Sequence, residues 1–364
     1  MAYTVRYANF DLGTGNNDGT TEADAWQTLA DMNTGLAGGG FLCHIKKQAA
    51  RPTIAANQIM CPDALIGNPN IIRGYGTTIN DGVRWEFGTP SWRNIYFNAH
   101  TTWDFVDFDG PASLRANGKP GSCLKRSRII QNDGGVEFAT FDSNYIELSG
   151  GSEIQHGAVG GAPCRLFRNY IRKTDTNASQ LAELDMFGHS LTIIDNIFHG
   201  NGSAGQDGIT VDRHNNSDGL VIANNIIYNC DQGISFGHIE NDNVARLSHI
   251  YGNLFDTMAG YAIEAPTTVV GQNRLMNNYY RNCTSGFTDY PDESTDGPAI
   301  ALTADPFVDT STNDLTINDT VGGGRVLRDA GFAANLAGGA MLNRPFGSFL
   351  SQLGGASPTP AHWG

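Results

Sequence analysis

Short apolar runs separated by polar turns recur through the middle of the chain. The pattern apolar-x-x-Asn-apolar-apolar appears in LFRNYI, IIDNIF, IANNII, IYGNLF and LMNNYY. Its asparagines are Asn169, Asn196, Asn225, Asn253 and Asn278, so the spacings are 27, 29, 28 and 25 residues. A period in this range predicts one coil of a β-solenoid for each repeat, with successive coils stacked about 4.8 Å apart.

The repeated asparagines are interpreted as scaffold residues. An asparagine at a bend between two strands tolerates left-handed backbone and can bond the amides of the coils above and below. Strand-like runs also occur earlier, in WRNIYF near Asn94 and at 103–110, 127–138 and 143–154, so we expect the solenoid to continue through them. The segment RKTDTNASQLAELDMFG, from about 172 to 188, is expected to be an insertion that lengthens one coil.

Alternating apolar and polar positions predict a second strand in each coil, in the segments DGITV, QGISF, YAIEA and SGFTD. Successive side chains of a strand point to opposite faces, so one set turns inward and the other forms an outward ladder. The predicted outward ladder is Thr210, Ser235, Glu264 and Thr288. The predicted inward set is Ile209, Val211, Ile234, Phe236, Ile263, Ala265 and Phe287.

Both ends of a solenoid need a cap, and the N-terminal segment supplies a candidate. Thr21 is expected to N-cap a short helix that carries Ala25, Trp26, Leu29 and Ala30 and ends at Gly35. The expected organisation is a cap over residues 1–40, a β-helix over 41–332, and a tail over 333–364. The tail is rich in Gly and Pro, and we expect it to pack along the solenoid or against a partner subunit.

Composition favours a turn-rich β protein, because 45 of the 364 residues are Gly and only 16% are charged. The 23 Lys and Arg against 37 Asp and Glu give a net charge of −14 with no basic cluster, which argues against a nucleic-acid partner. No run of about 18 apolar residues predicts membrane insertion. The opening MAYTVRYANFDLGTG lacks the features of a secretory signal, so export by that route is not expected.

The cysteines are expected to be free and mostly buried, because none forms a CxxC or CxxH pair. They are Cys43, Cys61, Cys123, Cys164, Cys230 and Cys283. Cys230 and Cys283 each follow a repeat asparagine by five residues, which places them two coils apart and about 10 Å from each other. No cofactor is expected, since GxSxG, Walker and HExxH patterns are absent from the sequence.

The Asn-Asp-Gly turn and Ala-Trp pair within 17–26 resemble the start of many right-handed parallel β-helix proteins of the pectate-lyase-like and phage tailspike-like group. ADPFVDTSTNDLTI at 304–317 and RVLRDAGF at 325–332 resemble their closing region, so the resemblance covers about residues 5 to 332. It implies an all-β fold, a single-stranded right-handed parallel β-helix with a short N-terminal capping helix. The group contains lyases, hydrolases and non-enzymes, so it implies a fold rather than an activity.

The richest stretch of chemistry-bearing residues is 207–240, with Glu264 one coil later. The candidate catalytic residues are Asp212, Arg213, His214, His238, Glu240 and Glu264. A glycoside hydrolase needs two carboxylates, which Asp212 with Glu240 or Glu264 would supply. A polysaccharide lyase needs groups that neutralise a uronate and take a proton, and Arg213, His214 and His238 are suited to this.

Two further sets of residues are weaker candidates. Asp207 and Asp231 lie close to glycines and are interpreted as ordinary turn residues. Glu147, Glu153 and His156 form a second possible group on an earlier coil.

The sequence supports two hypotheses on function. The first is a bacteriophage virion surface protein, tailspike-like or capsid-decorating, assembled in the host cytoplasm as a homotrimer that contacts other capsid or tail proteins. The second is a polysaccharide lyase or glycoside hydrolase that acts on a bacterial or algal polysaccharide, with secretion as the alternative location. A phage depolymerase would satisfy both.

Overall fold

The computed structural model describes most of the chain. The described residues are 2–51, 59–79, 81, 85–88, 94–97, 99–110, 113–116, 120–131, 134–156, 163–186, 190–213, 219–239, 245–264, 271–287 and 299–330. They fall into two compact units, Met1–Thr303 and Ala304–Gly364. The predicted tail at 333–364 lies outside the described residues.

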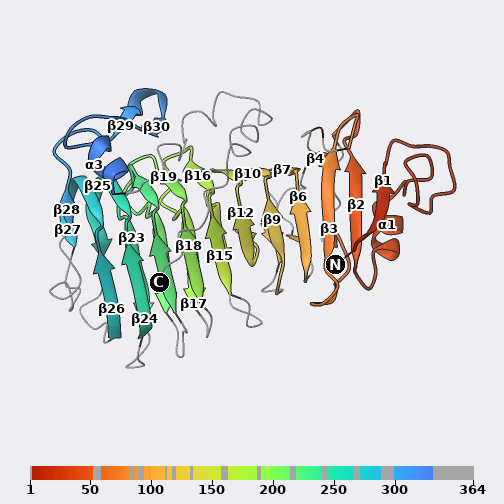
Figure 1. Cartoon of the computed structure of the whole chain (residues 1–364), viewed down its shortest axis with the longest axis horizontal. Coiled ribbons are helices and arrows are strands. Elements are labelled where there is room, and N and C mark those ends of the chain that lie inside the picture. The colour runs from red at the N-terminus through yellow and green to blue at the C-terminus, as the bar shows by residue number, and fades with distance from the viewer. Residues whose placement is uncertain are drawn as a thin grey trace. The chain divides into compact units, whose positions relative to one another are not determined.

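The first unit is a parallel β-helix, as predicted. Coils contribute one strand each to an 11-stranded sheet, here sheet A, and most coils contribute further strands to a 17-stranded sheet, sheet B. Strands of successive coils lie side by side along the unit, which Figure 1 shows from β1 in red to β24 and β26 in blue-green. All strand pairs of sheets A and B have parallel register, for example Leu191↔Leu220↔Ser248 in β18, β21 and β24.

Sheet A follows the order of the coils. Its strands are β1 (Thr4–Ala8), β2 (Phe41–Lys46), β3 (Asn70–Tyr75), β6 (Thr101–Asp104), β9 (Cys123–Lys125), β12 (Thr140–Asp142), β15 (Cys164–Phe167), β18 (Leu191–Ile194), β21 (Leu220–Ala223), β24 (Ala245–Tyr251) and β26 (Gly271–Met276).

Sheet B contains a leading and a trailing strand from most coils. The leading strands are β4 (Trp85–Gly88), β7 (Val106–Gly110), β10 (Arg128–Gln131), β13 (Tyr145–Leu148), β16 (Tyr170–Lys173), β19 (Ile197–His199) and β22 (Ile226–Tyr228). The trailing strands are β5 (Asn94–Tyr96), β8 (Ser113–Arg115), β11 (Gly135–Glu137), β14 (Glu153–His156), β17 (Ala182–Met186), β20 (Ile209–Arg213) and β23 (Ile234–Ile239). In the last coils β25 (Leu254–Glu264) and β27 (Tyr279–Phe287) run through both positions, and β28 (Ile300–Ala301) follows.

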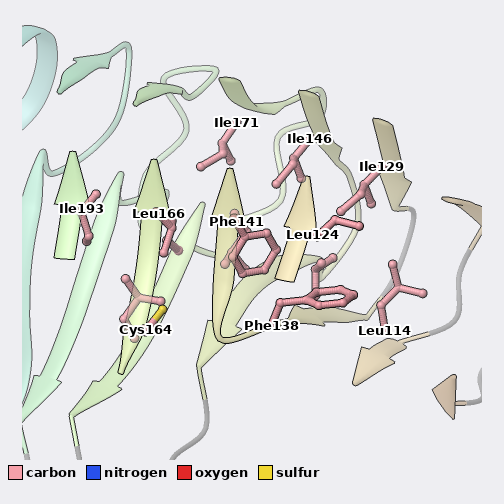
Figure 2. Packing of buried hydrophobic residues seen from close by; sticks show 14 of the residues in the cluster. Leu114, Leu124, Ile129, Phe138, Phe141, Ile146, Cys164, Leu166, Ile171 and Ile193 are labelled. Atoms are coloured by element: carbon pink, nitrogen blue, oxygen red, sulfur yellow. The ribbon is translucent and has the colours of Figure 1, made fainter. Parts of the chain in front are cut away.

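One apolar core runs through the coils. Equivalent inward residues stack in ladders because the coils are in register, as with Ile129, Ile146 and Ile171 on β10, β13 and β16. Figure 2 shows these side chains directed to the same interior as Leu124, Phe141, Leu166 and Ile193 of sheet A. Burial of this apolar surface, at roughly 25 cal/mol per Å², is the main force that holds the coils together.

The repeated asparagines form a buried hydrogen-bonded ladder where sheet A turns into the leading strands. The Asn196 side-chain oxygen accepts from the Asn169 backbone amide (2.9 Å), and its side-chain nitrogen donates to the Leu166 carbonyl (2.9 Å). This confirms their predicted role as scaffold. The left-handed residue, however, is the one before each asparagine, for example Arg168 at φ 55° and Asp195 at φ 59°. The asparagine itself lies directly before the leading strand, and its side chain bonds the neighbouring coils.

The N-terminal cap differs from the predicted helix. Helix α1 covers only Leu29–Gly35, and its N-cap is Thr28, whose side chain accepts from the Asp31 amide. Thr21 instead caps a turn by accepting from the Asp24 amide (3.1 Å). Asp and Asn side chains bond backbone amides across 16–27 and thereby offer an alternative to helix. The helix ends at Gly35, as predicted.

The predicted insertion at 172–188 is wrong in part, because Ala182–Met186 forms the regular trailing strand β17. β17 pairs in register with β14 and β20 on either side. Its alternation buries Ala182 and Leu184 in the core, a pattern too short to separate from a polar loop by sequence alone.

The cysteines agree with expectation: all of them are free. Cys283 lies opposite Met258 of the preceding coil, the position that Cys230 holds one coil earlier. Burial raises the pKa of Cys230 to about 12, so this thiol stays protonated near neutral pH.

The second unit is small. A two-stranded antiparallel sheet joins β29 (Phe307–Asp309) to β30 (Asp314–Ile317) through the 3₁₀ helix η1 (Thr310–Thr312), and helix α3 (Gly324–Asp329) follows. Asn318 fastens this unit, since its side-chain nitrogen donates to the carbonyls of Asp305 (2.8 Å) and Phe307 (2.6 Å).

Candidate functional site

The outward ladder predicted for the trailing strands is present. Thr210 on β20 lies opposite Ser235 on β23, and Ser235 lies opposite Glu264 on β25. The residues that alternate with them, including Ile209, Val211, Ile234, Phe236 and Ile263, are buried in the core. Ala265 and Thr288 lie outside the described residues, as does the side chain of Phe287.

Asp207 is held at the bend that leads into this ladder. Its Oδ1 accepts a hydrogen bond from the Gln232 amide (3.3 Å), and the Thr210 hydroxyl lies 3.5 Å from Oδ2. Gly208 permits the bend, because a Cβ there would lie 2.6 Å from Ile227 and 2.8 Å from the Gly233 carbonyl oxygen. The carboxyl group is therefore fixed by the backbone of the next coil.

Asp231 lies beside it, at the equivalent bend one coil later. Its Oδ2 accepts from the Gly205 amide (2.5 Å), and its own amide donates to the Gln206 carbonyl (3.0 Å). Asp231 directly precedes Gln232, the residue that bonds Asp207. In this register Asp207 lies opposite Gln232, so Asp231 is one position out of line with Asp207, but its charge still acts on the Asp207 carboxyl group.

The electrostatic consequence falls on Asp207. Burial raises the pKa of Asp207 to about 6, and the charge of Asp231 and, more weakly, that of Glu264 add to the rise. The hydrogen bonds from the Gln232 amide and from Ser235 act in the opposite direction. Asp207 therefore carries a proton over part of the neutral range, which ordinary carboxyl groups do not.

A carboxyl group with a raised pKa beside a second carboxyl group is an arrangement that general acid and base catalysis uses. The protonated group can donate to a leaving oxygen while its neighbour accepts a proton or attacks. The acidic bend, as we name Asp207, Asp231 and Glu264, is the best candidate site among the described residues. Sequence reasoning assigned Asp207 and Asp231 only to turns, because pKa depends on burial that the sequence does not show.

The other predicted catalytic residues lie on the same strands or outside the described residues. Asp212 and Arg213 end β20, opposite Asp185 and Met186 of β17. The register shifts between Val211 and Arg213. As a result, the single residue Asp212 lies opposite two residues of β23, Gly237 and His238. The structure thus brings the backbones of Asp212 and His238 to adjacent coils.

Their chemistry stays a prediction. The side chains of Asp212, Arg213 and His238 are not among those described, and His214 and Glu240 lie outside the described residues altogether. The predicted carboxylate pairs of Asp212 are therefore neither confirmed nor contradicted.

The weaker group on earlier coils has local structural partners. Glu147 on β13 accepts from the Tyr145 hydroxyl (2.6 Å), and Glu153 on β14 accepts from the Gln155 side chain (2.5 Å). The side chain of His156 is not described. These bonds hold each carboxylate to its own strand.

A polar pocket that the sequence reading missed lies over β4, β7 and β10. Its volume is about 80 Å³, and it is lined by Arg51, Glu86, Asp107, Phe108, Asp109, Arg128 and Ile130. The available signal was the alternation in WDFVDFDG, where two aspartates flank an inward Phe108. The partner residues come from other coils, so only the register reveals the pocket.

Over the part of the chain that is described, no cluster of three or more His, Cys, Asp or Glu is arranged to hold a metal ion. In that same part, no helix has the length and apolar character needed to cross a membrane. No protein-family model matches the chain, and no curated protein matches it.

Proposed function

We propose that this protein is a polysaccharide depolymerase of the glycoside hydrolase type, with its active site at the acidic bend. The observation that carries the proposal is the pKa of Asp207, raised to about 6 beside Asp231 on the adjacent coil. Clustered carboxyl groups with separated pKa values are typical of acid and base pairs in glycosidases. The proposal includes membership of the pectate-lyase-like and tailspike-like group. A sheet face that extends across many coils can bind an extended polysaccharide chain.

In the proposed reaction Asp207 donates its proton to the glycosidic oxygen as the C–O bond breaks. Asp231 either takes a proton from the attacking water or forms a glycosyl ester that water then opens. In both routes the leaving sugar gains the proton of Asp207 and the other sugar gains a hydroxyl group. The anomeric configuration of the first product, followed by NMR, distinguishes the two routes.

Hydrolysis is preferred to elimination because the acidic bend supplies carboxyl groups, the groups that glycoside hydrolases use as acid and as base or nucleophile. A location on a phage virion and a homotrimeric assembly, both expected from the sequence, are a separate proposal about where the activity is carried. A virion-borne depolymerase would meet both proposals.

The test is release of reducing ends from a panel of bacterial and algal polysaccharides by the purified chain. Asp207→Asn and Asp231→Asn should each lose at least about 100-fold in kcat/KM, the usual contribution of a positioned acid or base. Activity of the unmodified chain should fall as the pH rises through about 6, because Asp207 then loses its proton.

Asp195→Asn is the matched control. Burial also raises the pKa of Asp195, but this residue stands at the corner before β19 in a left-handed conformation, φ 59°, that asparagine tolerates. Its activity should equal that of the unmodified chain. Full activity in Asp207→Asn, or products with an unsaturated terminal sugar, would refute the hydrolase.

A further inference from the structure

The polar pocket over β4, β7 and β10 is distinct from the acidic bend. Glu86 of β4 lies opposite Asp107 of β7, and Asp107 lies opposite Arg128 of β10, so three successive coils each place a charged residue in one row. Asp109 and Ile130 form the neighbouring row on the same strands. The inward Phe108 forms the floor between the rows.

Most of its charged groups are held by ion pairs or hydrogen bonds. Arg51 forms an ion pair with Asp109, and Lys47 forms one with Glu86 (2.8 Å). Asp107 accepts from the Arg128 backbone amide (2.9 Å), which fixes its Oδ1 on the pocket wall. Among the described residues no hydrogen bond or ion pair engages the Arg128 guanidinium, so its donors are available to a ligand.

The charges around the pocket balance. Glu86, Asp107 and Asp109 oppose Arg51, Arg128 and Lys47. An anionic ligand would meet the carboxylates and a cationic ligand the guanidinium groups, so neither is favoured by charge. A ligand that both donates and accepts hydrogen bonds satisfies both sets, and the vicinal hydroxyls of a neutral sugar do this.

The pocket also lies on the same sheet as the acidic bend. β7 pairs with β10, and the pairing continues through β13 and β16 to β19, the strand before Asp207. At the stacking distance of the coils, the distance from β7 to β19 is about 19 Å. The row that begins at Asp109 and Ile130 continues through Glu147 and Arg172 to His199. A polysaccharide chain that follows this row would reach both places.

We propose that the pocket is a subsite that binds a neutral hexose unit of the polysaccharide cleaved at the acidic bend, an inference that rests on the proposed function. It assigns the substrate class: an uncharged polysaccharide bound over several sugar units. Arg128 donates to the ring or hydroxyl oxygens, and Asp107 and Asp109 accept from hydroxyl groups.

Binding is tested by calorimetry on the Asp207→Asn chain, which holds its ligand uncleaved. The probes are hexasaccharides of glucose, mannose and galactose in their common linkages, with hexagalacturonate as the charged comparator. Neutral hexasaccharides should bind, and Arg128→Gln or Asp109→Asn added to Asp207→Asn should raise Kd at least tenfold, about 1.4 kcal/mol. Arg165→Gln is the matched control, because Arg165 is exposed on β15 of sheet A, and its Kd should not change.

Three results would overturn the proposal: no neutral hexasaccharide binds, only hexagalacturonate binds, or Arg128→Gln and Arg165→Gln have the same Kd. Failure of the proposed hydrolase has a different signature, since neutral sugars would still bind through Arg128 while the unmodified chain released no reducing ends. Circular dichroism and the unfolding midpoint of each variant show that a raised Kd is not due to misfolding.

Discussion

Two partly buried carboxylates, Asp142 at the end of a sheet A strand and Asp207 at the bend before a trailing strand, show opposite behaviour within one repeating scaffold. Burial raises the pKa of Asp142, but the hydrogen bond from Ser143 and the charges of Arg168 and Lys125 outweigh it and hold the pKa below its ordinary value. Burial likewise raises the pKa of Asp207, to about 6, and there the charges of Asp231 and Glu264 add to the rise. Partial burial is thus accompanied by a lowered pKa where the neighbouring charges are cations and by a raised pKa where they are carboxylates.

The corner before the leading strands differs between the early and the late coils. From Asn144 onward the buried asparagine ladder bridges the coils, for example from the Asn225 amide to the Asn253 side chain (3.0 Å). In the earlier coils Ser127 and Val106 occupy the ladder positions, and the Ser127 hydroxyl accepts from the Val106 amide (3.2 Å).

Ion pairs bridge the early coils instead. Asp104 is almost wholly buried and binds Arg73 from the preceding coil (2.9 Å) and Arg126 from the following coil (2.7 Å to Nε). Phe105 and Arg126 nevertheless adopt the same left-handed conformation as Asn224 in the late coils. One backbone corner is therefore supported by two different chemistries, and only the late one repeats a residue that a sequence search can find.

The largest expected effect breaks the late corner. Asn225→Ala should lower the free energy of unfolding by about 2 to 4 kcal/mol, because it leaves the Asn196 amide and the Ile193 carbonyl buried without their partner. Urea unfolding followed by circular dichroism measures the change. Asn177→Ala, at an exposed turn, should change it by less than about 0.5 kcal/mol, and equal losses in the two variants would contradict the ladder's role.

The next effect concerns Asp207 and has the opposite sign. Its folded pKa of about 6 lies above the ordinary value of 3.8, so ionisation destabilises the folded state as the pH rises through this range. Asp207→Asn should therefore raise the free energy of unfolding at pH 7.5 by on the order of 1 to 3 kcal/mol. Near pH 4 the gain should vanish. Urea unfolding at both pH values tests this, and a pH-independent difference would argue against the raised pKa.

A smaller loss is expected in the early corner. Asp104→Asn should cost about 1 to 2 kcal/mol, because Arg73 and Arg126 lose a buried counter-charge but keep partial contact with water. Added salt should reduce the difference in free energy of unfolding between Asp104→Asn and the unmodified chain, because it screens the repulsion between the two guanidinium groups. Asn225→Ala should show no such salt dependence, and a common response would remove the distinction between the corners.

The smallest effect is expected when an asparagine of the late corner is introduced into the early corner. Ser127→Asn should extend the asparagine ladder by one coil and stabilise the fold by up to about 1 kcal/mol, since its oxygen would accept from the Val106 amide. Thermal unfolding measures the shift. A loss of stability would show that the early corner is packed for serine.

The fold could be predicted because its strongest signals are local and repeated. The asparagines from Asn169 to Asn278 report the coil length, and the alternation around Ile209 and Ile234 reports the second strand. The predicted helix at Thr21 and the insertion over β17 failed where short polar segments fit two structures equally well. Turn chemistry from Asp18 and Asp24 decided the first, and pairing with neighbouring coils decided the second.

The candidate chemistry divides in the same way. The sequence by itself determined that carboxyl groups concentrate between 207 and 264 and that Glu264 belongs to an outward ladder. Only the tertiary structure decided that Asp207 is partly buried and has a raised pKa, unlike an exposed aspartate. It also decided that Arg51, Asp109 and Arg128 line one pocket. The reason is physical: a pKa and a pocket depend on burial and on neighbours some 20 to 80 residues distant, and these are fixed by the stacking of the coils.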